Sequence, residues 1–197
     1  GLLVGADRWD SETPRLDKIL EELYKDKGER KIYPVHRLDK ETSGVLLLVK
    51  NEEFQKKAIE EFKNCRVKKE YVAAVKGIVS EEFSVNEPII TLKNKGGAFS
   101  KISPNGKEAF SHVTPVMVAG KKSLVKVEIK TGRTHQIRVH LNHAGYGIVG
   151  DEKYAKNKSA RMYLHAYKIE LLGYKFRSNL SSDFNRLGFE ISRNFEI

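Results

Sequence analysis

The stretch HRLDKETSGVLLLVK, from His36 to Lys50, joins two patterns with different meanings. Its second half holds the apolar run Val45 to Val49, which predicts a buried strand. Its first half places a histidine, an arginine and two acidic residues directly before that strand, and a turn at Ser43-Gly44 explains how the halves connect. Neither the strand nor the turn explains why Arg37 lies so close to Asp39. We therefore take this pair as the first candidate for chemistry.

Three helices are predicted around this stretch from apolar residues at helical spacing. The first runs from Arg15 to Asp26, and the second follows Asn51, a suitable N-cap. The third runs from Thr134, as its cap, to Gly145, as its end. The inner faces of the first two helices carry Leu16, Ile19, Leu20, Leu23, Phe54, Ala58 and Phe62.

Five further segments are predicted to be strands because β-branched and apolar residues dominate them. They are Val67–Val75, Pro88–Leu92, Ala109–Val118, Leu124–Ile129 and Met162–Leu172. The chain has no internal repeat, no low-complexity linker and no break in composition. The simplest fold is a single α+β domain, residues 1–197, on a mixed or antiparallel sheet.

The charge balance favours a polyanionic partner. The 197 residues include 36 Lys and Arg against 26 Asp and Glu, a net charge of +10. Such an excess is typical of nucleic-acid-binding proteins, although a generally basic surface is an equally good account of charge alone. A single cysteine, Cys65, excludes an intrachain disulfide and suits a reducing cytoplasm. With no visible signal peptide and no apolar run near the roughly 20 residues of a membrane span, we expect a cytoplasmic protein without membrane contact.

A second unusual stretch, KTGRTHQIRVHLNHAG, runs from Lys130 to Gly145. On a helix that begins near Thr134, one face carries His135, Arg138 and Asn142. Arg133 lies just before the helix, where backbone N–H groups favour an anion such as an RNA phosphate or a carboxylate. The alternative is a solvated helix face.

Other kinds of site find little support. The histidines His135, His140 and His143 lack the HExxH pattern and a common face, so we expect no metal. Ser43 lacks the GxSxG context of a catalytic serine. Because GxGxxG and GxxxxGK[ST] are also absent, we expect no nucleotide cofactor.

The stretch HRLDKETSGVLLLVK resembles the catalytic motif HRLDxxTSGLLLxAK of the RluA-type pseudouridine synthases. KKEYVAAVKG, Lys68 to Gly77, resembles the K-x-Y-x-A motif of that family, and YLHAYKIEL, Tyr163 to Leu171, resembles its LHA strand. TGRTHQIRVHLNHAGYGIVGDEKYA, Thr131 to Ala155, resembles its GRTHQIRxH…GDxxY motif. The resemblance covers about residues 30 to 172 and implies a catalytic domain with a central sheet, flanking helices and a basic cleft.

The chain departs from the family pattern at its beginning. Family members usually carry Lys-Pro before a Gly-Leu pair, whereas this chain begins at Gly1-Leu2. We expect a truncated N-terminus and no separate N-terminal RNA-binding domain.

The resemblance implies that the protein converts uridine in RNA to its C-glycoside isomer. Asp39 is then either a nucleophile at the ribose C1′ or a base that takes a sugar proton to give a glycal. Arg138 is expected to pair with Asp39, and Tyr71 to lie against the extruded base and help remove the C5 proton. Contacts with RNA are expected from Arg37, Arg133, His135 and Gln136.

Each of these residues also has a plainer interpretation. Asp39 in a turn could serve as a cap, Tyr71 could be a half-buried strand aromatic, and Arg37 could pair with an acidic neighbour. A catalytically silent RNA-binding or chaperone module on the same fold, and a metal-dependent nuclease, are the rival functions. We expect an isomerase that needs no cofactor, acts as a monomer, and takes ribosomal RNA rather than tRNA.

Overall fold

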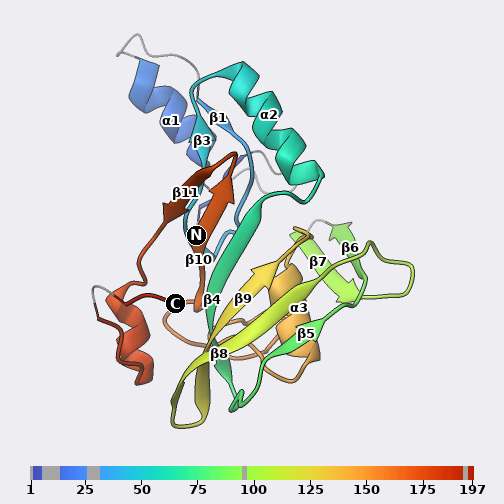
Figure 1. Ribbon diagram of the computed structural model, residues 1–197, viewed down its shortest axis with the longest axis vertical. Helices are drawn as coiled ribbons and strands as arrows, with labels where there is room; N and C mark the ends of the chain where they lie inside the picture. Colours follow the sequence, from blue (N-terminus) through green and yellow to red (C-terminus); the bar gives the residue numbers. More distant parts are fainter. Residues whose placement is uncertain (1, 6–13, 26–31, 95–96, 193–194) are drawn as a thin grey trace.

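The centre of the molecule is a twisted sheet whose strands lie in the order β11-β10-β4-β9-β8-β5 (Figure 1). The computed structural model describes residues 2–5, 14–25, 32–94, 97–192 and 195–197. Within these residues every pairing of the sheet is antiparallel except that of the short β2, which runs parallel to β10. The predicted mixed sheet of an α+β domain is therefore confirmed. Its strands are β2 (Ser43–Gly44), β4 (Lys68–Lys76), β5 (Phe83–Val85), β8 (Ser111–Ala119), β9 (Lys122–Ile129), β10 (Leu164–Leu171) and β11 (Tyr174–Arg177).

Both faces of the sheet are covered. On one face, Val75 and Val127 pack against Ile137 and Leu141 of helix α3 (Gln136–His143). The other face forms a second cluster under the 3₁₀ helix η1 (Ser182–Leu187), centred on Val72, Ala74, Leu124, Tyr163, Tyr167, Phe184 and Phe189. Because side chains on a strand alternate between faces, β4 and β9 contribute to both clusters. The predicted strands at Val67–Val75 and Leu124–Ile129 follow from this double burial.

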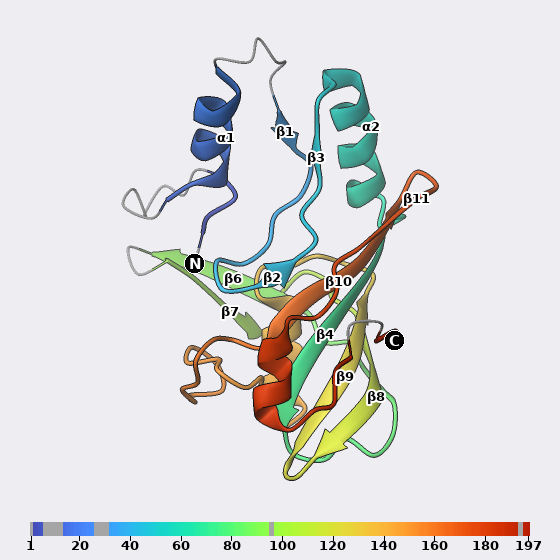
Figure 2. The same ribbon diagram turned by 90° about the vertical axis from the view of Figure 1, so that its left-hand side faces the viewer.

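A smaller layer lies beside one end of the sheet (Figure 2). It consists of α1 (Leu16–Lys25), α2 (Glu52–Lys63) and the antiparallel pair β1 (Tyr33–Pro34) and β3 (Leu48–Val49). The first predicted helix is confirmed, except that Asp26 lies outside the described residues. In the second, Asn51 Oδ1 accepts the Phe54 N–H at 2.9 Å, which is the predicted cap.

The predicted buried strand Val45–Val49 is wrong. Only Leu48–Val49 pairs as a strand, and the run is half-buried. Gly44 has φ +111° and lies so close to the backbone of Ala166 that no Cβ would fit. The chain therefore leaves β10 after a two-residue contact, and His36 Nε2 accepts the Leu47 N–H at 2.8 Å across the resulting loop.

The third helix begins later than expected, because Thr134 does not cap it. His135 occupies the N-cap position at φ 55° without a side-chain cap, and the Gln136 Oε1 accepts the Arg133 N–H at 3.0 Å. The alternative of a solvated helix face is excluded for most of the helix, since residues 136–141 are all buried. A two-stranded ribbon of β6 (Ile89–Asn94) and β7 (Gly97–Ile102) covers part of this helix, and its Ile89 belongs to the same hydrophobic cluster as Val139 of α3.

Candidate active site

All seven residues expected at the site line one pocket. It lies where the loop after β1 meets β4, the end of β9 and the start of α3. The lining consists of Arg37, Leu38, Asp39, Thr42, Tyr71, Ile129, Gly132, Arg133, His135, Gln136, Ile137, Arg138 and Leu164. The sequence motifs that supply these residues are far apart in the chain, so the fold assembles the pocket.

Asp39 faces this pocket from a loop. The Thr42 N–H donates to the Asp39 carbonyl at 2.9 Å, which closes a turn at residues 40–41, whereas the turn predicted at Ser43-Gly44 is the short strand β2. The carboxylate is 23% exposed. Its pKa is raised from 3.8 to about 6, mainly by burial; Arg138 and Arg37 oppose this shift, and the nearby Glu41 adds to it. Asp39 is therefore mostly ionised at neutral pH, but can exchange a proton there.

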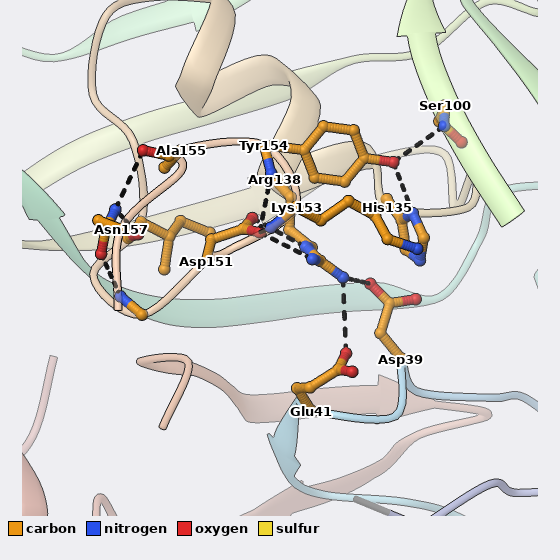
Figure 3. A network of polar contacts seen from close by, with 12 residues as sticks. Asp39, Glu41, Ser100, His135, Arg138, Asp151, Lys153, Tyr154, Ala155 and Asn157 are labelled. Atoms are coloured by element: carbon orange, nitrogen blue, oxygen red, sulfur yellow. Dashed lines mark hydrogen bonds and ion pairs between the residues drawn. The ribbon is translucent and has the colours of Figure 1, made fainter. Parts of the chain in front are cut away.

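Arg138 pairs mainly with Asp151 rather than with Asp39 (Figure 3). Its Nε and Nη2 donate to the two Asp151 oxygens at 2.9 and 2.8 Å, and the side chains are 4% and 1% exposed. The third nitrogen, Nη1, lies 3.9 Å from Asp39 Oδ2 and 3.7 Å from Glu41 Oε2. The expected pair with Asp39 thus exists only as a longer contact, and the two-point partner is a different carboxylate.

Asp151 is a residue that sequence reasoning missed. It belongs to the quoted stretch GDEKYA, and a buried arginine requires a buried carboxylate, which is the signal that could have found it. Burial raises the Asp151 pKa, but the Arg138 hydrogen bonds and charge outweigh this and lower it overall. Its Oδ1 also accepts the N–H groups of Lys153 and Tyr154, both at 3.1 Å.

Tyr154, also missed, fixes the orientation of His135. Its hydroxyl accepts the Ser100 N–H at 2.9 Å and lies 2.6 Å from His135 Nδ1. Burial, followed by the charge of Arg138, lowers the His135 pKa to about 3, so the imidazole is neutral. In the hydrogen bond between the Tyr154 hydroxyl and Nδ1, the donor depends on the tautomer of the neutral ring. The Tyr154 ring lies 5.0 Å from the Arg138 guanidinium carbon.

Tyr71 is a half-buried residue of β4 in the same pocket as Asp39. Burial and the Asp39 charge both raise the pKa of its hydroxyl above the ordinary value. Tyr71 is therefore a neutral phenol at physiological pH. It can donate a hydrogen bond, but it is not a free phenolate.

Gln136 and Lys69 hold the loop before α3 in place. The Gln136 amide accepts from the Thr131 hydroxyl and the Arg133 N–H, and donates to Phe110 O and Ser111 Oγ. Lys69 Nζ donates to the carbonyls of Lys130 and Thr131 at 3.2 and 3.3 Å. Since its amide is used within the protein, Gln136 supports the loop and is a poor candidate for an RNA contact.

Arg37 and Arg133 are the better candidates for RNA contacts. Arg37 is exposed at the pocket. The Nε of Arg133 donates to Glu108 O at 2.8 Å. Neither guanidinium forms an ion pair with a carboxylate in the described part of the chain.

The histidines do not form a metal site in the described residues, where no group of three metal-ligating side chains occurs. Both ring nitrogens of His140 are within hydrogen-bond distance of the protein, at 2.9 Å from Ser111 Oγ and 3.0 Å from Glu87 O. Ser43 Oγ lies 2.8 Å from His165 Nδ1, and the Arg161 guanidinium donates to it. It belongs to the β2–β10 contact, outside the Asp39 pocket.

A sequence profile of RNA pseudouridylate synthases matches residues 1–143. The chain belongs to this family. An uncharacterized RNA pseudouridine synthase of Helicobacter pylori is 55% identical over 153 residues, which cover 76% of this chain and 63% of the relative. The ribosomal large subunit pseudouridine synthase D of Borreliella burgdorferi is 39% identical over 151 residues, or 73% of this chain and 46% of that one. The chain thus spans less than two thirds of the length of these curated relatives.

Solved structures of the pseudouridylate synthase family share the fold. Human RNA pseudouridylate synthase domain containing 1 is 26% identical, with a TM-score of 0.71 over 94% of this chain and 86% of that one. Human RNA pseudouridylate synthase domain containing 4 gives a TM-score of 0.72 at 23% identity, over 87% of this chain and 80% of that one, and supports the fold alone. No helix in the described ranges is long and apolar enough to cross a membrane.

Proposed function

We propose that this protein isomerises uridine in RNA to pseudouridine. The observation that carries the proposal is the common pocket of Asp39, Tyr71 and Arg138, which come from three separate motifs. Family membership supplies the reaction, and the pocket supplies a carboxylate, a phenol and a guanidinium where that reaction needs them. A silent binding module has no chemical reason to bring all three together.

The target uridine must leave its stack before its C1′ can reach Asp39. The bond between N1 and C1′ then breaks, the uracil turns, and a bond forms between C5 and C1′. The hydrogen on C5 leaves and N1 gains one, so atoms and electrons balance without an oxidant, a reductant or a nucleotide cofactor. Asp39 acts on the sugar either as a nucleophile at C1′ or as a base that gives a glycal.

The surrounding groups serve this carboxylate. Arg138, fixed by Asp151, presents Nη1 to Asp39 and stabilises its ionised form. In this proposal the Tyr71 ring packs against the base, and its hydroxyl passes the C5 proton towards Asp39. His135 is neutral, and its Nε2 forms a hydrogen bond with the uracil or the ribose.

The RNA class is proposed as ribosomal RNA, acted on by a cytoplasmic monomer. Support comes from two relatives named as ribosomal large subunit pseudouridine synthases, at 39% and 38% identity. Transfer RNA is the alternative, and no motif of the chain separates the two.

Mapping of pseudouridine across total RNA, incubated with and without the protein, tests the proposal. We expect new pseudouridines at discrete ribosomal positions, formed equally in the presence of EDTA. Loss of activity in EDTA would favour the metal-dependent nuclease instead. RNA without any new pseudouridine would contradict the proposal.

A further inference from the structure

A second groove adjoins the candidate active site. It has a volume of about 380 Å³ and is lined by Ile89, Ile90, Thr91, Lys93, Asn105, Gly106, Lys107, Gly132, Arg133 and Thr134. Gly132 and Arg133 also line the Asp39 pocket, so the two cavities are adjacent and share this part of their lining. A chain bound at Asp39 therefore has to pass only this short shared segment to reach the groove.

The groove is cationic without matching carboxylates. Lys93 and Lys107 are exposed, and Arg133 lies between them and the Asp39 pocket. Across the described ranges none of these three cations forms an ion pair, whereas many other lysines and arginines do. An anion bound here would not have to displace a carboxylate first.

The wall of the groove is a rigid part of the fold. Ile89 and Lys107 exchange two backbone hydrogen bonds of 2.9 Å, so Lys107 is fixed on the edge of β6. This requires Gly106, because a Cβ there would lie 2.5 Å from the Ile89 carbonyl carbon. With this pairing, strand alternation turns the N–H groups of Thr91 and Lys93 toward the same edge, away from β7. The groove thus offers ammonium groups and backbone donors along one line.

We propose that this β6-edge groove, defined by Lys93, Lys107 and Arg133, binds the phosphodiester backbone of the nucleotides that flank the target uridine. The inference rests on the proposed function for the identity of the polyanion. Lysines bind phosphates as point charges, and repeated charges with N–H donors suit a phosphodiester chain. An acidic peptide is the less suitable occupant, because the groove adjoins the pocket that we propose to hold the target nucleotide.

The test measures binding of a fluorescent oligouridylate of about 12 nucleotides by anisotropy at several salt concentrations. The test variant is Lys93→Ala/Lys107→Ala. The matched control is Lys76→Ala/Lys121→Ala, which removes the same charge from exposed lysines at the far end of β4 and in the β8–β9 turn. Both variants keep Arg133 and every residue of the Asp39 pocket.

We expect the groove variant to lose affinity by on the order of tenfold near physiological salt, with a salt slope smaller by about 1.4. This value is two single-strand phosphate contacts at about 0.7 each. The control should change less than about twofold and keep the slope of the unmodified protein. Equal effects of the two variants would overturn the proposal, as would the absence of salt-dependent binding by the unmodified protein.

Photo-crosslinking with 4-thiouridine in the same oligonucleotide locates the RNA directly. We expect cross-linked peptides from residues 89–93 and 103–107 in the unmodified protein. Displacement of the RNA by an equal concentration of oligoglutamate would overturn the choice of RNA as occupant. Neither measurement depends on turnover. Binding in the groove without pseudouridine formation would contradict the proposed function alone. Pseudouridine formation together with unchanged RNA binding by the groove variant would contradict the groove proposal alone.

Discussion

The guanidinium of Arg138 binds Asp151 through two hydrogen bonds of 2.9 and 2.8 Å and approaches Asp39 only to 3.9 Å. Asp151 therefore sets the direction of Arg138 and leaves Nη1 facing the pocket. A buried ion pair of this kind contributes little net stability, but it holds a charge in one orientation. Asp39 therefore has a cation in a fixed orientation nearby without a short hydrogen bond to it. Its carboxylate stays free for the reaction with the sugar that we propose.

Asp151→Asn should disturb the fold and the site together. The substitution leaves the Arg138 charge buried without its two-point partner, so we expect the free energy of unfolding to fall by on the order of 3 kcal/mol. Single-turnover rates of the folded variant should also fall, because Nη1 loses its fixed direction. Urea denaturation and rate measurements check both expectations.

Asp183→Asn is the matched control for that prediction. Asp183 is 36% exposed and pairs with Arg186 at 3.7 Å, so its loss should cost less than about 1 kcal/mol. Equal destabilisation by the two substitutions would show that the Arg138–Asp151 pair has no special role.

The pH dependence of the rate should report Asp39. Its pKa is raised to about 6, so the carboxyl holds a proton below that pH and the rate should rise as pH increases through 6. Glu41→Gln removes a charge that raises this pKa, so the midpoint of the acid limb should move to lower pH. Single-turnover rates at saturating RNA measure both midpoints.

Glu53→Gln serves as the control for the pH experiment, because Glu53 pairs with Lys57 at 2.8 Å on the exposed side of α2. It should leave the midpoint unchanged. A midpoint near the ordinary carboxyl pKa in the unmodified protein, or no movement in Glu41→Gln, would contradict the account of Asp39.

Substitutions at Tyr71 separate its hydroxyl from its ring. If the hydroxyl relays the C5 proton, Tyr71→Phe should lower turnover by roughly 10²–10⁴. Tyr71→Leu also removes the aromatic face, and should weaken RNA binding by about 1–3 kcal/mol in addition. Single-turnover rates and binding curves for both variants test this, and two variants that match the unmodified protein would place Tyr71 outside the site.

The parts of the fold that follow local rules were predictable from the sequence. The Asn51 cap and helix α2 depend on residues within one turn, and β4 and β9 carry their apolar pattern in their own residues. The candidate catalytic residue Asp39 was also predictable, because the motif that resembles a known family consists of consecutive residues. The structure places all seven expected site residues at one pocket, while their roles remain predictions.

The sequence-based predictions failed where segments that are far apart in the chain pack against one another. The apolar run Val45–Val49 breaks because Gly44 packs against Ala166, more than a hundred residues away along the chain. The sequence also left a solvated face for α3 open as an alternative, whereas Arg138 pairs with Asp151 and Val139 packs against Ile89 of the β6–β7 ribbon. The periodicity of α3 shows which residues share a face, but not what covers that face.

The central claim is that the Asp39 carboxylate carries out the isomerisation. Release of tritium from RNA labelled at uridine C5 measures this step, because the C5 hydrogen leaves whichever role Asp39 plays on the sugar. Asp39→Asn keeps the shape of the side chain and removes its charge. We predict that this variant binds the labelled RNA within a few-fold of the unmodified protein and releases no tritium above background, whereas near-normal release would contradict the account.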